Sequence, residues 1–315
     1  MQKYKIPCAR STSFSAYAQA EKYIQRQQPP LIVKADGLAA GKGVTVAESI
    51  PQALEALAAI MEAKAFGTAG DRVIIEERLS GREMSTFVFT DGITVVPMVD
   101  ACDYKTVFDG DQGPNTGGMG SYSPPHFYKP SLAKRVQETI MEPAVKAMHK
   151  ENRHYKGVLY GGLMITGEGP KVLEFNARFG DPETQVILPL LKTDLVDILL
   201  AVINGNLNQV NIEWSTDACV GVVMASAGYP GKYKTGLPIT GLGNLDKDIL
   251  VFHAGTKTGS KPGQVLTNGG RVLTVVAMGK TVAEAREKVY LNLPRIHFEG
   301  CHYRRDIAAT SHKGG

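Results

Sequence analysis

Residues 173–183 carry the highest density of side chains in the chain that are able to do chemistry. Glu174 and Asn176 alternate with apolar residues, as on a strand, so both side chains are expected on one face, with Arg178 next along it. Two oxygen ligands on one face suit Mg²⁺, or Mn²⁺, which keeps waters and nucleotide phosphates at its other positions. The stretch therefore predicts a metal–nucleotide site.

The catalytic group is expected directly behind this pair of ligands. Arg178 can stabilise negative charge that develops during phosphoryl transfer. Asp181 and Glu183 follow it within a few residues, and we assign all three to the catalytic set. A salt-bridged strand end is the plainer alternative, but it does not explain so many polar residues and glycines in one place.

A glycine-rich stretch near the N-terminus, residues 34–44, has the composition of a phosphate-binding loop. Lys34, Gly41, Lys42 and Gly43 are its expected contacts, because glycines let backbone N–H groups approach phosphate oxygens and the lysines add charge. Its spacing differs from that of a Walker A loop, and a strand-like run follows it where that loop has a helix. The stretch predicts a β-hairpin flap over phosphates, although an ordinary glycine-rich hairpin has the same pattern.

A charged run at residues 76–83 follows a strand-like segment. Backbone groups of Glu76, Glu77, Arg78 and Leu79 could hydrogen-bond an adenine edge, and the Glu83 carboxylate could bind ribose hydroxyls. A solvated charged turn is the commoner source of such a run. The loop at residues 113–120, rich in glycine, is either the wall of a backbone-lined pocket or a flexible surface loop.

Other chemistries lack support in the sequence. The seven histidines show no metal-ligand spacing, and no G-x-S-x-G elbow occurs. With 35 basic and 31 acidic residues spread along the chain, the net charge of +4 indicates no nucleic-acid partner. The longest apolar runs fall far short of the roughly 20 residues that span a bilayer, so no membrane partner is expected. Four scattered cysteines and the lack of a leader-like N-terminus favour the cytoplasm.

The elements that must position these residues alternate between short strands and helices. The 315 residues, 43% hydrophobic and 21% charged, are enough for two domains or one large one. Hairpin signals imply antiparallel sheet, so the fold class is α+β. Strands are expected at residues 31–34, 44–46, 73–75, 84–89, 94–98, 157–165, 171–175, 218–225, 250–253 and 271–278, and helices at 14–27, 53–61, 131–150, 184–191, 195–204 and 282–293. Residues 99–126 are predicted to form an ordered functional loop.

Taken together, these motifs resemble the phosphoribosylamine-glycine ligase family of the ATP-grasp superfamily. The resemblance covers almost the whole chain and rests on Lys34-Ala-Asp-Gly-Leu-Ala-Ala-Gly-Lys-Gly-Val, Gly113-Pro-Asn-Thr-Gly-Gly-Met-Gly, Leu173-Glu-Phe-Asn-Ala-Arg-Phe-Gly-Asp-Pro-Glu-Thr-Gln185 and Phe252-His-Ala-Gly-Thr256. It implies an ATP-grasp fold, in which two α+β subdomains grip ATP, followed by a small mixed α/β C-terminal domain. The expected boundaries are 1–77, 78–208 and 209–309, with a tail at 310–315.

The family resemblance also implies roles for the candidate residues. Adenine is held at the segment matching residues 76–79, ribose at Glu83, and the nucleotide contacts Asn115. Glu174 and Asn176 match the family's metal ligands. The implied reaction joins glycine to 5-phosphoribosylamine through glycyl phosphate, with ATP consumed and glycinamide ribonucleotide formed in purine biosynthesis.

Two departures from the family pattern bear on activity. Members begin with a dinucleotide-fold-like domain of roughly a hundred residues, the size of a small domain, and nothing here resembles it. A separate chain supplying that part is a further candidate partner. Thr106 stands where the family usually has an arginine that contacts ATP, whereas Asp103 and Lys105 are kept. The alternatives are thus a truncated ATP-binding fragment, or a ligase of a neighbouring purine step.

Overall fold

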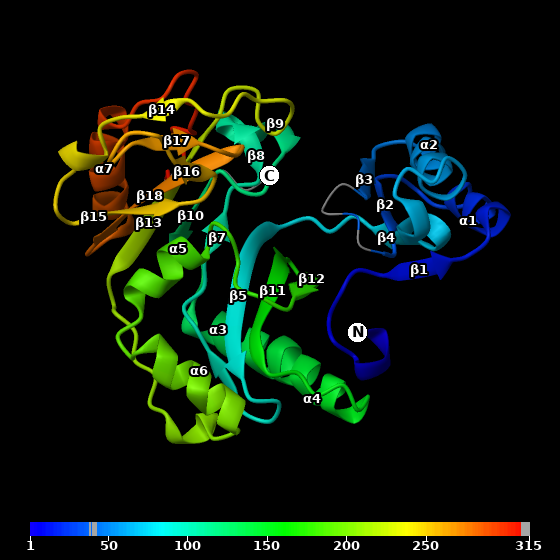
Figure 1. Ribbon diagram of the computed structural model, residues 1–315. Coiled ribbons are helices and arrows are strands. Elements are labelled where there is room, and N and C mark those ends of the chain that lie inside the picture. The colour runs from blue at the N-terminus through cyan, green and yellow to red at the C-terminus, as the bar shows by residue number, and fades with distance from the viewer. Residues whose placement is uncertain (38, 40–42, 310–315) are drawn as a thin grey trace.

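The computed structural model describes residues 1–37, 39 and 43–309, which form a small N-terminal unit and a larger body (Figure 1). The small unit has an antiparallel sheet with strand order β1-β4-β2-β3, covered by two helices. Its elements are β1 (Ser11–Phe14), α1 (Tyr17–Ile24), β2 (Leu31–Ala35), β3 (Val44–Ala47), α2 (Ile50–Met61) and β4 (Val73–Glu77). Its buried side chains form a core of their own.

Helix α2 shows how local sequence builds this unit. The Ser49 hydroxyl accepts from the Gln52 N–H, and Pro51 sits in the first turn, as expected of a helix start. Ala53, Leu57 and Ile60 recur at helical spacing and are buried against the sheet. The expected helix at residues 14–27 is shorter in the structure, because residues 11–14 form β1.

The first residues of the chain lie outside this unit. The backbone N–H of Val172, in the second sheet, donates to Pro7 O at 2.8 Å, and Lys3 Nζ is 2.5 Å from Glu151 Oε1. Ile6 is buried in the core of the larger body. Residues 1–8 thus belong with the larger body, whereas the sequence placed all of 1–77 in the small subdomain.

The second sheet, with order β12-β11-β5-β6, is the scaffold of the larger body. Both expected hairpins are confirmed: β5 (Arg82–Thr90) pairs with β6 (Val95–Pro97), and β11 (Gly157–Thr166) pairs with β12 (Gly169–Asn176). The helix expected over 131–150 is present as α3 (Pro130–Val136) and α4 (Glu142–Lys150), joined by a π-helical turn at Gln137–Met141. Two further helices are α5 (Thr184–Ile187) and α6 (Leu195–Asn204).

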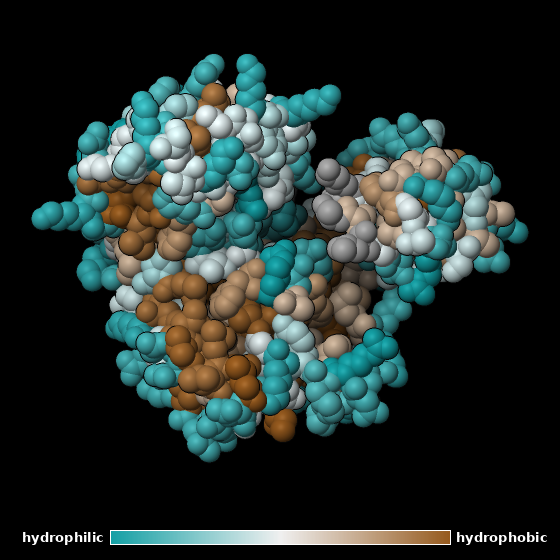
Figure 2. Space-filling model, viewed as in Figure 1, coloured by the Kyte–Doolittle hydropathy of each residue, from teal (hydrophilic) through white to brown (hydrophobic). Residues whose placement is uncertain are grey.

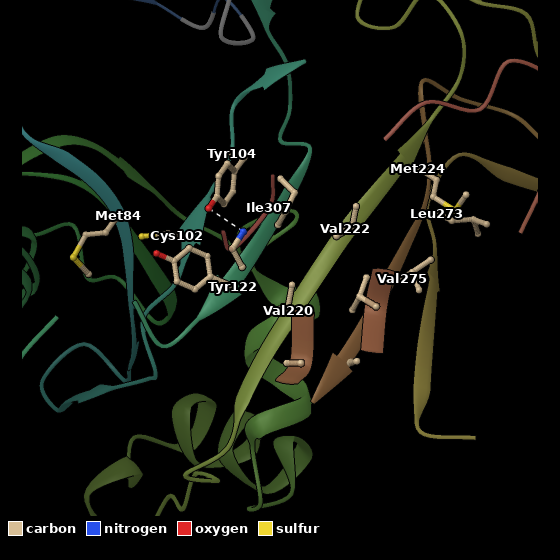
Figure 3. Packing of buried hydrophobic residues seen from close by; sticks show 14 of the residues in the cluster. Met84, Cys102, Tyr104, Tyr122, Val220, Val222, Met224, Leu273, Val275 and Ile307 are labelled. Atoms are coloured by element: carbon tan, nitrogen blue, oxygen red, sulfur yellow. Dashed lines mark hydrogen bonds between the residues drawn. The ribbon is translucent and has the colours of Figure 1, made fainter. Parts of the chain in front are cut away.

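A third sheet runs across the expected boundary at residue 208. Its order is β15-β18-β13-β10-β7, and β10 (Gly120–Ser123) pairs antiparallel with β13 (Ala218–Ala225). The other members are β7 (Cys102–Asp103), β15 (Ile249–His253) and β18 (Arg271–Gly279), with α7 (Val282–Asn292) packed on β13 and β18. Figure 3 shows side chains from β7, β10, β13 and β18 along this sheet, all members of one buried cluster. Residues 78–208 and 209–309 therefore share a sheet and a core.

The predicted functional loop at residues 99–126 is ordered, and it contains strands that its composition did not indicate. Besides β7 and β10, it holds the hairpin of β8 (Thr106–Phe108) and β9 (Gln112–Asn115). A small sheet of β14 (Pro238–Ile239), β17 (Val265–Thr267) and β16 (Thr256–Thr258) was also not predicted.

Apolar side chains gather on one face of the larger body, over α5 and α6 (Figure 2). On α6, Val196, Leu200 and Ile203 are 62%, 50% and 66% exposed, at a spacing that forms one stripe. None of the helices in the described part of the chain is long and apolar enough to cross a membrane.

Candidate functional site

The second sheet presents a row of candidate residues on one face. Glu174 on β12 is paired with Gly162 on β11, which in turn is paired with Ser85 on β5. Residues paired across antiparallel strands share a face, so these three lie in line. Asn176 is paired with Tyr160 one step further along. Gly162 leaves room for its neighbours on this face, because a β-carbon there would lie 3.2 Å from Glu174 Cγ and 3.4 Å from Tyr160 Cε1.

The expected metal ligands are adjacent and exposed enough to be reached. Asn176 Nδ2 donates to Glu174 Oε1 at 3.0 Å, so the amide and the carboxylate lie side by side on one face of β12. Among the described residues no group of three or more His, Cys, Asp or Glu side chains is placed to hold a metal. Two oxygen donors fit a hard divalent cation that completes its shell with phosphate oxygens and water. They do not distinguish Mg²⁺ from Mn²⁺.

The three residues expected to be catalytic occupy different environments. Arg178 is exposed, and its Nη1 donates to Phe179 O at 2.8 Å. Glu183 is only 3% exposed, and its Oε1 accepts from Ser85 Oγ at 2.9 Å, so it covers the Ser85 end of the row described above. The Asp181 carboxylate accepts from Gln185 Nε2 at 3.0 Å and from Arg271. Arg178 and Asp181 are exposed, whereas Glu183 is buried.

A charged cluster lies at the start of β5 and at the end of β7; the sequence assigned Glu83 to the ribose but gave no role to Asp103 and Lys105. Glu83 Oε2 is 2.5 Å from Lys105 Nζ. Burial raises the pKa of Asp103 to about 7, with the lysine opposing the shift. Burial lowers the pKa of Lys105, but Asp103 and Glu83 outweigh it and hold that pKa above its ordinary value. Lys105 therefore stays a cation beside the candidate ribose ligand.

A cavity of about 520 Å³ adjoins this cluster. Its lining includes Arg78, Glu83 and Asn115, three of the residues expected to contact the nucleotide. Lys105 and Thr106 complete the wall on the β7–β9 side. Residues far apart in sequence thus meet at one cavity, and the sequence had assigned three of them, Arg78, Glu83 and Asn115, to the nucleotide.

The charged run at residues 76–79 is anchored by ion pairs. Glu76 Oε2 is 2.5 Å from Lys34 Nζ, which joins the end of β4 to β2. Glu77 accepts from the Arg10 backbone N–H at 3.0 Å; although burial opposes it, hydrogen bonds from Arg10 lower the pKa of Glu77. Arg78 Nη1 is 2.6 Å from Glu48 Oε1, and Leu79 is half-buried. Of these residues Arg78 also lines the cavity, so the charged run extends to the cavity wall.

The glycine-rich hairpin joins β2 to β3, as expected. The Ala35 N–H donates to Gly43 O at 2.9 Å, closing the hairpin at its base. Gly43 is buried, and a β-carbon there would lie 2.6 Å from Ala39 Cβ, so only glycine fits. The expected phosphate contacts Gly41 and Lys42 lie outside the described residues.

Thr106, where the family usually has arginine, is bonded to a buried arginine from the C-terminal segment. Arg304 is 0% exposed, and its Nη1 donates to Thr106 Oγ1 at 2.8 Å. Arg304 Nη2 also lies 2.6 Å from Asp306 Oδ2 and 3.0 Å from Asp111 Oδ1. The cavity wall at β8 is thus tied to residues near the end of the described chain.

This geometry agrees with what comparison with known proteins finds. The family model described as phosphoribosylglycinamide synthetase, ATP-grasp (A) domain, matches residues 1–184, and the model for the C domain of the same enzyme matches 219–310. The chain belongs to the phosphoribosylglycinamide synthetase family. It is 51% identical over 310 residues to a phosphoribosylamine–glycine ligase from Caldanaerobacter subterraneus, covering 98% of this chain and 73% of the relative.

Two solved structures match the fold of this chain. The crystal structure of phosphoribosylamine–glycine ligase from Thermotoga maritima matches with a TM-score of 0.88 and 38% identity, over 98% of this chain and 76% of the other. A biotin carboxylase from Campylobacter jejuni, solved as a complex with beta-gamma-ATP, matches with a TM-score of 0.73 at 16% identity, over 98% of this chain and 67% of the other. This second likeness shows the fold alone, and both together establish the ATP-grasp architecture that the family resemblance implied.

Proposed function

We propose that this chain carries out the ligation of glycine to 5-phosphoribosylamine at the expense of ATP, the activity for which its relatives are named. The observation that carries the proposal is the pair Glu174 and Asn176, whose side chains are in contact on the face of the second sheet that also carries Glu83, a residue of the cavity lining. Family membership sets the class of reaction, an ATP-dependent carbon–nitrogen ligation in purine biosynthesis. The four free cysteines suit a reducing cytoplasm.

The reaction takes place in two transfers. A carboxylate oxygen of glycine attacks the γ-phosphorus of ATP, the bond to the bridging oxygen of ADP breaks, and glycyl phosphate forms. The amine of 5-phosphoribosylamine then attacks the acyl carbon and loses a proton, and inorganic phosphate leaves. No covalent bond to the protein is needed, so the protein contributes position and charge.

Each candidate residue has a place in this scheme. Glu174 and Asn176 would hold Mg²⁺ or Mn²⁺, which neutralises phosphate charge when bound. Arg178, exposed beyond them, would stabilise the charge on the transferred phosphoryl group. Glu83 would bind the ribose hydroxyls, with Lys105 setting its orientation. Lys34, Gly43 and the backbone of residues 76–79 would hold the phosphates and adenine.

The experiment is ADP formation in the presence of Mg²⁺, with glycine and freshly generated 5-phosphoribosylamine omitted in turn. We expect turnover only when both are present. Glu174→Gln should lower kcat about 100-fold or more, since losing one charge-stabilising group in such a site costs about 3 kcal/mol. The matched control is Glu168→Gln, on the turn of the same hairpin with its side chain 80% exposed, which should leave kcat unchanged.

The outcomes separate the alternatives for this chain. ATP binding without turnover would make it a nucleotide-binding fragment, and turnover restored by a second chain that supplies the family's N-terminal domain would identify that chain as its partner. Turnover with a different purine precursor replacing 5-phosphoribosylamine would move it to a neighbouring step. Equal loss of activity in the two glutamate variants would contradict the metal assignment.

A further inference from the structure

One arginine of the C-terminal unit reaches into the catalytic region. Arg271 begins β18, and its Nη1 donates to Gly117 O at 2.7 Å and to Asp181 O at 2.9 Å. The same guanidinium binds both carboxylate oxygens of Asp181, with Nη2 3.0 Å from Oδ2 and Nη1 3.1 Å from Oδ1. Arg271 therefore joins the glycine-rich loop at 113–120 to the loop that follows Arg178.

The backbone around Arg271 is built to aim it. Met224 on β13 is paired with Leu273, but Ala225 is paired with Arg271, so the register shifts by one residue at this point. Such bulges redirect side chains beside functional sites. The Gly255 N–H donates to Arg271 O at 2.9 Å, and a β-carbon at Gly255 would lie 2.6 Å from that oxygen. The family motif at residues 252–256 thus supports the backbone of Arg271.

The two loops that Arg271 holds are packed against each other with no spare room. A β-carbon at Gly117 would lie 2.9 Å from Arg271 Cζ, and one at Gly118 would lie 2.3 Å from Pro182 Cδ. Ser121 Oγ donates to Pro182 O at 2.7 Å, a second link between the loops. A small shift of the guanidinium would therefore move both loops together.

We propose that Arg271 is a positioning residue for the ligation, acting through Asp181 and Gly117; the kinetic part of this inference rests on the proposed function. A bidentate guanidinium–carboxylate pair fixes direction as well as distance, which a lysine ammonium cannot reproduce. Asp181 follows Arg178 by three residues, and Asn115 opens the other loop. Arg271 thus lets the C-terminal unit set the placement of two groups proposed to contact ATP.

The kinetic test compares Arg271→Met and Arg271→Lys with the wild-type chain in the two-substrate ADP assay. Arg271→Met should lower kcat about 100-fold, the usual result of misplacing reacting groups by about 1 Å. KM for ATP should stay within about threefold, because most nucleotide contacts lie elsewhere. Arg271→Lys should recover part of kcat. The control is Lys280→Met, which removes an exposed ion pair to Asp217 just beyond the other end of β18 and should change neither constant.

A double-mutant cycle tests whether Arg271 acts through Asp181. If it does, Asp181→Asn combined with Arg271→Met should be no slower than the slower single variant, because both remove the same pair. If the two losses in kcat multiply in the double variant, the inference is overturned. It is also overturned if Arg271→Met keeps the wild-type kcat.

Amide hydrogen exchange gives a readout that does not require activity. Arg271→Met should exchange at least about tenfold faster at residues 116–119 and 180–185, while α7 and the Lys280→Met control keep wild-type rates. Unchanged exchange in these loops overturns the inference whether or not the chain turns over. If the wild-type chain forms no ADP in a substrate-dependent way, the proposed function is refuted. The amide exchange rates would then still show whether Arg271 orders the two loops. Faster exchange across all elements would mean that Arg271 is merely structural.

Discussion

At the scale of single residues, Asp100 is the buried carboxyl group with the clearest expected effect on stability. Its Oδ1 is buried without a hydrogen-bond partner. Burial raises the pKa of Asp100 to about 7 from its ordinary value of 3.8, although hydrogen bonds from Thr86 and Tyr128 oppose the shift. Between about pH 4 and pH 7 the Asp100 carboxyl therefore binds a proton in the folded chain that it has lost in the unfolded chain. Stability contributed by Asp100 therefore falls as pH rises from about 4 to about 7.

Asp100→Asn should remove this pH dependence. Between pH 5 and pH 8 the unfolding free energy of the wild-type chain should drop by about 3 kcal/mol relative to the variant, because about two pH units lie inside the window and each costs about 1.4 kcal/mol. The measurement is urea unfolding of both chains at the two pH values. Profiles that run parallel would mean that Asp100 titrates in its ordinary range and is already ionised in the fold at pH 5.

Sequence reasoning worked at this scale where the signal was periodic. The alternation around Glu174 and Asn176 correctly predicted that the two side chains share a face, because strand geometry dictates it. It could not predict that the Asp181 carboxylate is held by Arg271, since that partner lies on another strand far along the chain. The same holds for Glu183, whose burial against Ser85 depends on how α5 packs.

At the scale of elements, hairpins and capped helices were predictable and nonlocal pairings were not. Strand β13 and the Thr281–Glu284 cap of α7 match the expectation, because both depend on neighbouring residues. The strands inside residues 99–126 are short, and the segment joins the rest of the third sheet only through a distant partner, as in the pairing of Ser121 with Gly221. No local pattern indicates such a partner, so the composition of this glycine- and proline-rich stretch predicts a loop.

The segment after Cys301 is an element without regular structure that still fixes the cavity wall. Besides the contacts of Arg304, the Ala308 N–H donates to Tyr104 Oη at 2.9 Å, the dashed bond in Figure 3. The Arg304 guanidinium also lies over the Tyr104 ring, 4.8 Å from its centroid. Two carboxylates, a hydroxyl and an aromatic face therefore surround one fully buried charge.

Replacing Arg304 by Met should destabilise the chain by about 3–5 kcal/mol, the usual cost of breaking a buried ion pair by removing one partner. Arg295→Met is the matched control, because Arg295 pairs with Asp246 at 2.8 Å with both side chains well exposed. That variant should lose less than about 1 kcal/mol. The midpoint of urea unfolding, at an unchanged slope, gives both values, and equal losses would show that the buried network contributes nothing special.

At the scale of the whole molecule, the chain consists of two bodies with separate cores. The small unit buries its own cluster, which includes Ile24, Leu57 and Ile75, while two larger clusters fill the rest. The links between the bodies are few and polar, such as the 3.7 Å contact of Glu77 Oε1 with Lys171 Nζ. Elements with their own cores and few shared contacts tend to open independently.

Without nucleotide, calorimetry should therefore resolve two unfolding transitions, the small unit first. ATP with Mg²⁺ at about 100 times its Kd should stabilise the bound form by about 2.7 kcal/mol and merge the transitions, because the proposed site takes contacts from both bodies. Lys34→Met should abolish the ATP-dependent shift. Lys64→Met removes an exposed pair with Asp71 in the same unit and should keep the shift. If both variants respond to ATP like the wild-type chain, Lys34 is not part of the nucleotide site. If the two transitions of the wild-type chain stay apart in saturating ATP, the nucleotide contacts only one body.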